Sequence, residues 1–273
     1  PFLGNFLPII TSSDFLDLIL ISEGAEDSEE IINSYLSFWK SISKIEINLE
    51  NDQYSLNIIE NTFLQLIPIF LKIESSSQSE EMDVNLNEPS VKANQILDLI
   101  LSKYIDQSLP ILESFINDCQ SSESFGERET SLSCVFFLIQ YLDNENIDEY
   151  FRLIKNGLSD EVPRVRQNAI YCSQAFCDTY KTSNPLSIEI MQDVITKISE
   201  DEYTASDAAT VIRSFFTIDD FPFFEESMIT LIEFSSTSNL EDSEIAFKSL
   251  EILVKCSTIE NRHNLLNLLL QLF

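Results

Sequence analysis

The sequence predicts an all-α protein, an α-solenoid built from repeated helical hairpins. Apolar residues recur every three to four positions, and no alternation with a period of two persists along the 273 residues. Only 4 Gly and 8 Pro occur, which suits helices joined by short polar loops better than many tight β-turns. The second helices of the hairpins are expected to begin near residues 90, 126, 163, 203 and 242.

This spacing indicates the type of repeat. The intervals of roughly 36–41 residues are close to the ~40–47 residues of HEAT and armadillo units. We therefore expect HEAT-type hairpins wound into a right-handed superhelix, with about six helix pairs and a trailing helix in one array over residues 1–273. The last residues, 265–273, are rich in leucine and unlike a polar cap, so we expect the array to be a segment of a longer solenoid.

Residues 159–180 give the most complete repeat signature. An acidic turn precedes Pro163, which is tolerated in a first helical turn because its missing N–H would have no helical partner. One apolar stripe then follows at i, i+4, i+7 and i+11, formed by Val165, Ala169, Cys172 and Phe176. Asp160 and Arg166 bracket the helix start, and we expect them to form a structural pair within the repeat.

The other elements follow from the same periodicity. Pro68 is expected to bend its helix because it removes a backbone donor. The most polar stretch, 74–89, is expected to be an exposed acidic loop carrying Glu80, Glu81 and Asp83. Besides one or two short helices within 3–21, the expected helices are 29–43, 54–73, 91–104, 107–119, 127–141, 147–157, 188–198, 203–216, 221–234, 242–256 and 265–273.

Charge limits the partners of the chain. Sixteen Lys and Arg against 46 Asp and Glu give a formal net charge of −30. Nucleic acid is excluded as a natural partner, because binding it requires cations that neutralise phosphates. A basic protein segment is the complementary partner, although acidity can also serve solubility alone.

Composition argues against an enzyme, a metal site or a membrane span. His263 is the only histidine, and the five cysteines form no C-x-x-C, so neither zinc binding nor Ser-His or Cys-His catalysis is supported. Isolated glycines form no phosphate-binding loop, and no cofactor is expected. No apolar run approaches the ~18–20 residues of a membrane span, so no membrane insertion is expected.

The candidate binding residues lie opposite the apolar stripes. Gln167, Tyr171, Gln174 and Asp178 share this face of the 163–180 helix, and Asp207 and Thr210 occupy the comparable face of the next second helix. Acidic and aromatic groups on a concave surface can bind a Lys- or Arg-rich segment by charge pairing and cation–π contact. The alternative is that Tyr171 packs on a neighbouring hairpin and the acids are only solvated.

An aromatic cluster surrounds Pro222. It comprises Phe221, Phe223 and Phe224 at the expected start of a helix. Aromatic residues at such positions usually pack the turn of the hairpin. The second interpretation is a cleft that accepts apolar side chains of a peptide.

A succession of short stretches resembles one family of transport proteins. The stretches are YLSFWKSI at 35–42, LQLIPIF at 64–70, EEMD at 80–83, SVKANQILDL at 90–99, YIDQSLPIL at 104–112, Arg128-Glu129, and 160–178. Their order and spacing are similar to the middle of the importin-β (karyopherin-β) nuclear transport receptors over most of residues 1–256.

The resemblance implies a function. Such a receptor carries basic import signals or an adaptor on its inner face, releases them to Ran-GTP, and contacts phenylalanine-glycine nucleoporins with its outer helices. It works in cytoplasm and nucleus and at the nuclear pore. By position, Glu80, Glu81 and Asp83 would form its acidic loop. Tyr171 and Thr210 stand where the family has inner-face tryptophans, which implies either altered cargo preference or a divergent receptor.

The leading hypothesis is thus a non-enzymatic transport receptor of the importin-β type. The alternative is a different HEAT-repeat scaffold, such as a phosphatase or coat-adaptor subunit.

Overall fold

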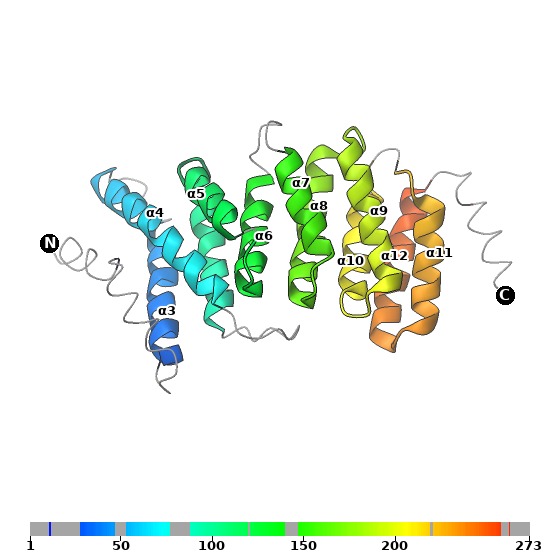
Figure 1. The fold of residues 1–273 in the computed structure, drawn as a ribbon, viewed down its shortest axis with the longest axis horizontal. Helices are drawn as coiled ribbons and strands as arrows, with labels where there is room; N and C mark the ends of the chain where they lie inside the picture. Colours follow the sequence, from blue (N-terminus) through cyan, green and yellow to red (C-terminus); the bar gives the residue numbers. More distant parts are fainter. Residues whose placement is uncertain are drawn as a thin grey trace. The chain divides into compact units, whose positions relative to one another are not determined.

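Every regular element in the part of the chain that the structure describes is a helix. The computed structural model describes Thr11, residues 28–46, 53–76, 88–119, 121–139, 147–218 and 221–257, and Arg262. The helices in these ranges are α3 (Ser28–Glu46), α4 (Gln53–Ser75), α5 (Pro89–Cys119), α6 (Phe125–Ile139), α7 (Ile147–Leu158), α8 (Pro163–Tyr180), α9 (Pro185–Glu200), α10 (Ala205–Phe215), α11 (Phe224–Thr237) and α12 (Leu240–Cys256) (Figure 1). The all-α prediction is confirmed.

The chain divides into two compact units, Pro1–Leu138 and Ile139–Phe273. The single array expected over residues 1–273 stays a prediction. The expected helices at 3–21 and 265–273, the acidic residues Glu80, Glu81 and Asp83, and His263 lie outside the described residues.

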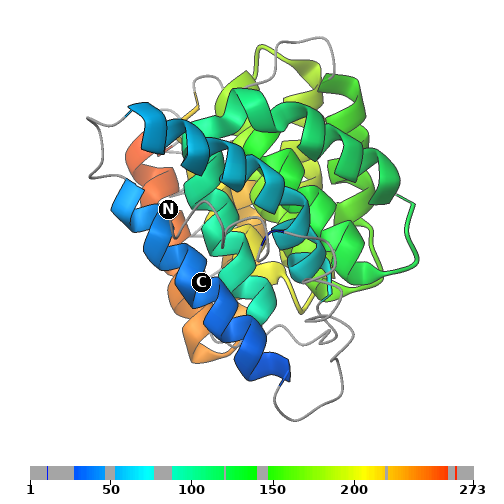
Figure 2. The ribbon, with the colours of Figure 1, turned by 90° about the vertical axis from the view of Figure 1, so that its left-hand side faces the viewer.

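In the first unit, α3 and α4 both pack against α5. Both are nearest the viewer in Figure 2, in blue and blue-green. Trp39 is buried on α3 and its ring meets Phe63 of α4 edge to face, with 6.1 Å between centroids. Two lysines also join α3 to α5: Lys40 Nζ donates to Gln95 Oε1 over 2.8 Å and Lys92 Nζ to Asn33 Oδ1 over 2.7 Å.

The expected boundary between the helices at 91–104 and 107–119 coincides with a kink in the structure. Residues 91–104 and 107–119 form one element, α5, with a break at Tyr104, where φ is −121° and ψ is 30°. The buried hydroxyl of Ser108 donates to the Tyr104 carbonyl over 2.6 Å. Two helical segments therefore meet at a kink at Tyr104.

The two ends of the stretch 74–89, expected to be an acidic loop, are helical. Glu74 and Ser75 belong to the last turn of α4, and Pro89 is the first residue of α5. Glu74 is buried rather than exposed, and its Oε1 accepts a hydrogen bond of 2.7 Å from Asn94 Nδ2. The serine-rich sequence around Glu74 gave no sign of this long-range contact.

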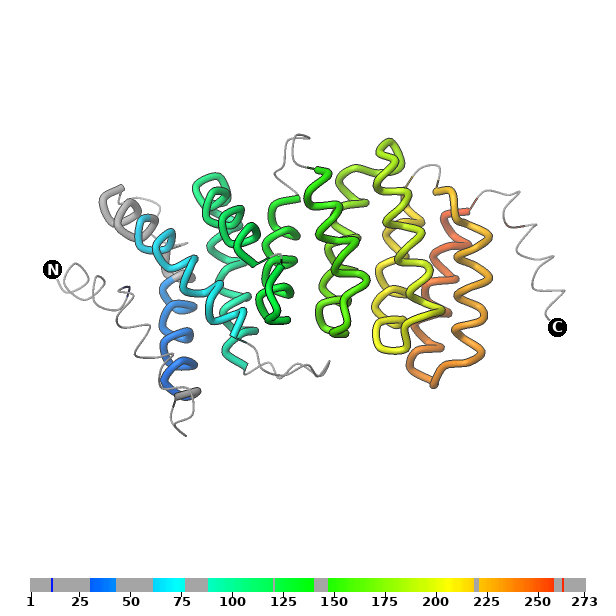
Figure 3. The backbone as a smooth tube through the Cα atoms, in the orientation of Figure 1, coloured from blue at the N-terminus to red at the C-terminus, as the bar shows by residue number. Residues whose placement is uncertain are grey.

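The second unit consists of two layers of helices. The first helices α7, α9 and α11 contact one another in sequence, and the second helices α8, α10 and α12 do the same. Each first helix also packs against the second helix that follows it, and Figure 3 traces this alternation from green to red. Such stacking of hairpins is how a repeat buries an apolar face that it cannot cover alone.

The stripe of α8 forms the core between these layers. Val165, Ala169, Cys172 and Phe176 are all buried, and the ring of Phe176 lies 4.8 Å from that of Tyr180. Proline begins α8, as the sequence predicted, and Val162 precedes it in an extended conformation. Since this core fixes the rotation of α8 about its own axis, it also determines which residues face outward.

Candidate protein-binding site

The candidate site lies on the polar faces of α8 and α10. We call it the α8–α10 face, formed by Gln167, Tyr171, Gln174, Asp178, Asp207 and Thr210. Its centre is the carboxylate of Asp207. Tyr171 Oη donates to Asp207 Oδ1 over 2.6 Å, and Gln167 Nε2 donates to Asp207 Oδ2 over 2.9 Å. Both oxygens of the Asp207 carboxylate, on α10, thus accept hydrogen bonds from side chains of α8.

A second carboxylate lies further along α8. The side chains of Gln174 on α8 and Ser214 on α10 lie close to Asp178, and the Ser214 hydroxyl itself donates to the Val211 carbonyl over 2.9 Å. Partial burial raises the pKa of Asp178, and these two polar neighbours together with nearby Lys181 oppose that rise. Thr210 is exposed on α10, one turn from Asp207 and one turn from Ser214.

Tyr171 combines an exposed ring with a fixed hydroxyl. The residue is 38% exposed although its Oη bonds to the neighbouring helix. Partial burial and the adjacent Asp207 carboxylate both raise the pKa of Tyr171, so the phenol stays protonated and remains a donor. The face therefore offers a partly exposed ring beside the Asp207 carboxylate, with Asp178 two turns further along α8, and a ring next to a carboxylate can attract a lysine or arginine side chain.

Arg166 links the turns of two successive hairpins. Its guanidinium makes two bonds to the Asp201 carboxylate, Nε to Oδ2 at 2.5 Å and Nη2 to Oδ1 at 3.1 Å. Burial alone would raise the pKa of Asp201, but hydrogen bonds from Arg166 and Thr204 outweigh it and hold the pKa below its ordinary value. A bidentate pair of this kind fixes geometry as well as charge.

The expected pairing of Asp160 with Arg166 needs correction. Arg166 Nη1 donates to the main-chain carbonyls of Asp160 (2.8 Å) and Glu161 (2.9 Å), while its carboxylate partner is Asp201. The Asp160 carboxylate accepts from the main-chain N–H of Val162 over 2.9 Å. Sequence analysis missed Asp201 because it lies 35 residues from Arg166 and only the stacking of hairpins joins the two.

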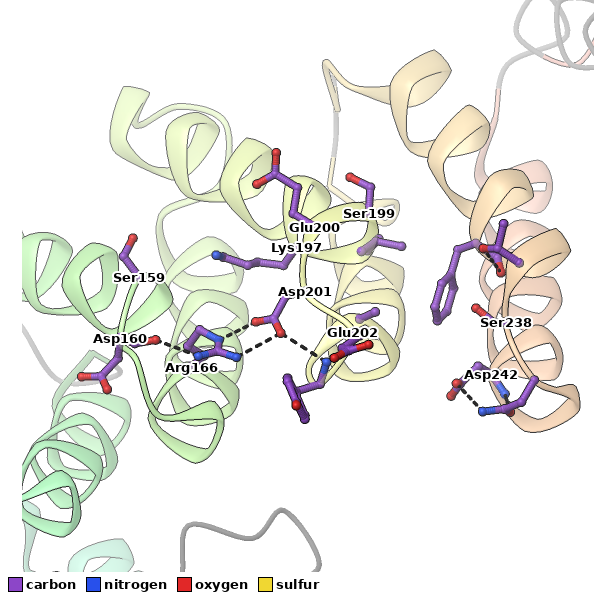
Figure 4. A pocket seen from close by; sticks show the side chains of 16 residues that line it. Ser159, Asp160, Arg166, Lys197, Ser199, Glu200, Asp201, Glu202, Ser238 and Asp242 are labelled. Atoms are coloured by element: carbon purple, nitrogen blue, oxygen red, sulfur yellow. Dashed lines mark hydrogen bonds and ion pairs between the residues drawn. The ribbon is translucent and has the colours of Figure 1, made fainter.

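A cavity of about 810 Å³ opens at these turns. We call it the turn groove; it lies within the second unit and extends from the α7–α8 turn past the α9–α10 turn to the α11–α12 turn. Figure 4 shows Arg166 and Asp201 joined at one end, with Ser238 and Asp242 at the other. Five carboxylate residues and two cationic residues line it, and Tyr203 is 58% exposed at its edge.

The aromatic residues near Pro222 pack on one another. Phe221 lies 5.4 Å from the ring of buried Phe216 and 6.1 Å from that of Phe223, both edge to face. Phe223 precedes α11 and Phe224 begins it. The three predicted phenylalanines are each partly exposed, so the cluster closes the turn and still presents apolar surface.

Among the described residues, His, Cys, Asp and Glu never gather in threes with the geometry of a metal site. None of the helices resolved here is both long and apolar enough to cross a membrane.

Comparison with solved structures identifies the fold as the HEAT-repeat solenoid of the importin-β receptors. Yeast importin-β, Kap95p, matches with a TM-score of 0.73 and 15% identity over 94% of this chain and 32% of its own. Kap121p bound to RanGTP matches with a TM-score of 0.68 and 14% identity over 93% of this chain and 26% of its own. Kap121p bound to the SUMO protease Ulp1p matches with a TM-score of 0.67 and 15% identity over 98% of this chain and 28% of its own.

These matches confirm the resemblance at the level of the fold. The chain spans about a third of the length of the receptors it matches. Another of these structures is a complex of Kap95 with Nup1. No protein-family model matches the sequence, and no curated protein matches it either.

Proposed function

We propose that this chain is part of a nuclear transport receptor of the importin-β type, a binding protein rather than an enzyme. The observation that carries the proposal is the α8–α10 face, where the partly exposed Tyr171 ring lies beside the Asp207 carboxylate on a fold shared with karyopherins. Its cargo is a Lys- or Arg-rich import signal, or an adaptor that carries one. The net charge of −30 favours such a partner over a long range.

The remaining partners follow the structural neighbours. Kap121p is bound to RanGTP in one of them and Kap95 to Nup1 in another, and we propose Ran and nucleoporins as partners here too. In this proposal Glu80, Glu81 and Asp83 assist cargo release, and Phe221, Phe223 and Phe224 offer apolar surface to phenylalanine side chains of nucleoporins. The protein would then shuttle between cytoplasm and nucleus.

The test is binding of the 273-residue chain to a Lys/Arg-rich import-signal peptide across a salt series. We expect Tyr171→Ala to weaken binding about tenfold, because the cation–π contact is lost. Asp207→Ala should weaken it roughly three- to tenfold and flatten the salt dependence, because one ion pair is removed.

Two control variants separate the effects. Tyr171→Phe removes the hydrogen bond to Asp207 but keeps the ring, so it should lose less affinity than Tyr171→Ala. Glu233→Ala removes an exposed carboxylate on α11, away from this face, and should bind like the wild type. If the peptide binds equally to all variants, the site assignment is wrong; if it fails to bind at any salt, the generic scaffold becomes the better hypothesis.

A further inference from the structure

The packing of successive second helices defines which residues are equivalent. Four buried residues of α8 have buried counterparts 39 positions later at the start of and along α10: Val165 and Thr204, Ala169 and Ala208, Cys172 and Val211, Phe176 and Phe215. Ala208, Val211 and Phe215 in turn have buried counterparts 38 positions later on α12: Ala246, Ser249 and Leu253. Both intervals come from the core and are independent of the turns.

The same intervals show that the contact between Arg166 and Asp201 is not repeated in the next hairpin. Arg166 of α8 holds the Asp201 carboxylate of the following turn. Its counterpart 39 residues later is Ala205, and the counterpart of Asp201 38 residues later is Asn239. The first eight residues of α10, ASDAATVI, contain no lysine or arginine. Aligning α10 with α8 one or two positions differently would therefore still place no cation opposite Arg166.

The turn groove lies where the second guanidinium would be. Ala205 and Asn239 both line it, together with Ser199 and Glu200, the counterparts of Asp160 and Glu161. Arg166 binds the main-chain carbonyls of Asp160 and Glu161. Ser199 and Glu200 stand in the last turn of α9, where carbonyls lack helical partners and the helix dipole favours a cation.

The charged and aromatic side chains around the turn groove also suit a guanidinium group. Glu202 and Asp242 line it from opposite sides, as Figure 4 shows, and the groove is also lined by partly exposed Phe234 and by Tyr203. The Lys197 amine extends toward the turn of Ser159 and Asp160, away from Ser238 and Asp242. The far end of the groove therefore combines carboxylates with aromatic rings and has no cation of its own among its lining residues.

We propose that the turn groove binds an arginine side chain presented by a basic segment of a partner protein, in the place that Arg166 occupies one repeat earlier. Arginine is favoured over lysine because a planar fork of donors can reach carbonyls and a carboxylate together and stack on a ring. None of the six residues of the α8–α10 face is among the residues lining the groove, so the two sites are separate.

The experiment is an NMR titration of the full 273-residue chain with a short neutral-flanked peptide that contains one arginine. Matched peptides carry lysine or citrulline instead. We expect shifts centred on the amides of Glu202, Tyr203 and Asn239, an affinity for the arginine peptide about fivefold above that for lysine, and no binding of citrulline.

Variants locate the site. The double change Glu202→Gln with Asp242→Asn alters two partly or fully exposed carboxylates and should weaken arginine binding about tenfold. Glu251→Gln, an exposed carboxylate on α12 outside both sites, should leave it unchanged, and Asp178→Asn tests whether the peptide binds the α8–α10 face instead. Ala205→Arg should occupy the groove in cis and abolish the peptide shifts.

Three results would overturn the proposal: equal affinity for lysine and arginine, shifts that avoid the groove, or binding indifferent to the double change. Loss of binding in Asp178→Asn alone would assign the peptide to the α8–α10 face and support the proposed function without the groove. Failure of an import-signal peptide to bind, with the arginine selectivity intact, would reject the transport function and keep the groove.

Discussion

At the scale of single residues, Glu74 is an ionisable group of the first unit that is buried in the folded chain. It stands in the last turn of α4, buried, with Asn94 bonded to Oε1 while Oε2 has no hydrogen-bond partner. Burial raises the pKa of Glu74 to about 7, the Asn94 hydrogen bond and the nearby Ser133 hydroxyl oppose the rise, and the Glu129 carboxylate adds to it. A negative charge at a helix C-terminus is also disfavoured by the dipole.

A pH-dependent stability follows from Glu74. Because its folded-state pKa lies above the unfolded value of 4.5, the folded protein binds the extra proton between these values and loses stability as pH rises toward 7. Glu74→Gln should therefore match the wild type near pH 4 and exceed its free energy of unfolding by up to about 3 kcal/mol at pH 8.5. Urea titration followed by the fluorescence of Trp39, which lies in the same unit, measures this.

The matched control is Glu30→Gln, an exposed carboxylate on α3 of the same unit. It should show no pH-dependent gain over the wild type. Equal stability of Glu74→Gln and wild type at both pH values would mean that Glu74 ionises without cost where it stands.

At the scale of elements, the Arg166–Asp201 pair joins the first turn of α8 to the turn before α10. Both side chains are largely buried, at 13% and 8% exposure. Asp201→Asn should destabilise the contact by about 3 kcal/mol near pH 7, because it leaves the guanidinium without its counter-charge. Hydrogen-exchange rates of α8 and α10 measure the loss, since they report the stability of individual elements.

The stability that the Arg166–Asp201 pair contributes depends on pH with the opposite sign to the stability linked to Glu74. The folded-state pKa of Asp201 is lowered, so its contribution is present above the unfolded value of 3.8 and is lost as pH falls further. The difference between variant and wild type should be largest near pH 7 and shrink below about pH 4. Glu251→Gln, in an exposed pair on α12, should leave exchange in α8 and α10 unchanged, and a constant difference down to pH 3 would contradict the assignment.

At the scale of the whole molecule, the net charge of −30 should act against folding and for association with basic partners. Raising NaCl from 20 to 500 mM, about a fivefold shortening of the screening length, should raise the melting temperature because it weakens repulsion among carboxylates. The same change should weaken binding of a basic peptide. A melting temperature that falls with salt would mean that attractive pairs outweigh the repulsion.

The helices and the polar or apolar character of their faces follow from local sequence patterns. The stripe Val165, Ala169, Cys172 and Phe176 was predicted from spacing alone and is buried, because helical periodicity is a local property that fixes which side must avoid water. The predicted face residues Tyr171 and Asp207 also come together, since both lie opposite their stripes on helices that stack.

Contacts between residues in different hairpins could not be predicted from the sequence and are visible only in the folded chain. Asp201 as the partner of Arg166, the burial of Glu74 against α5, and the groove beside Ala205 depend on how helices 20 to 40 residues apart are placed in three dimensions. Periodicity indicates that a face is polar or apolar but not which distant side chain meets it. Those contacts arise from packing, and here they set the ionisation of the buried carboxyls and the position of the groove.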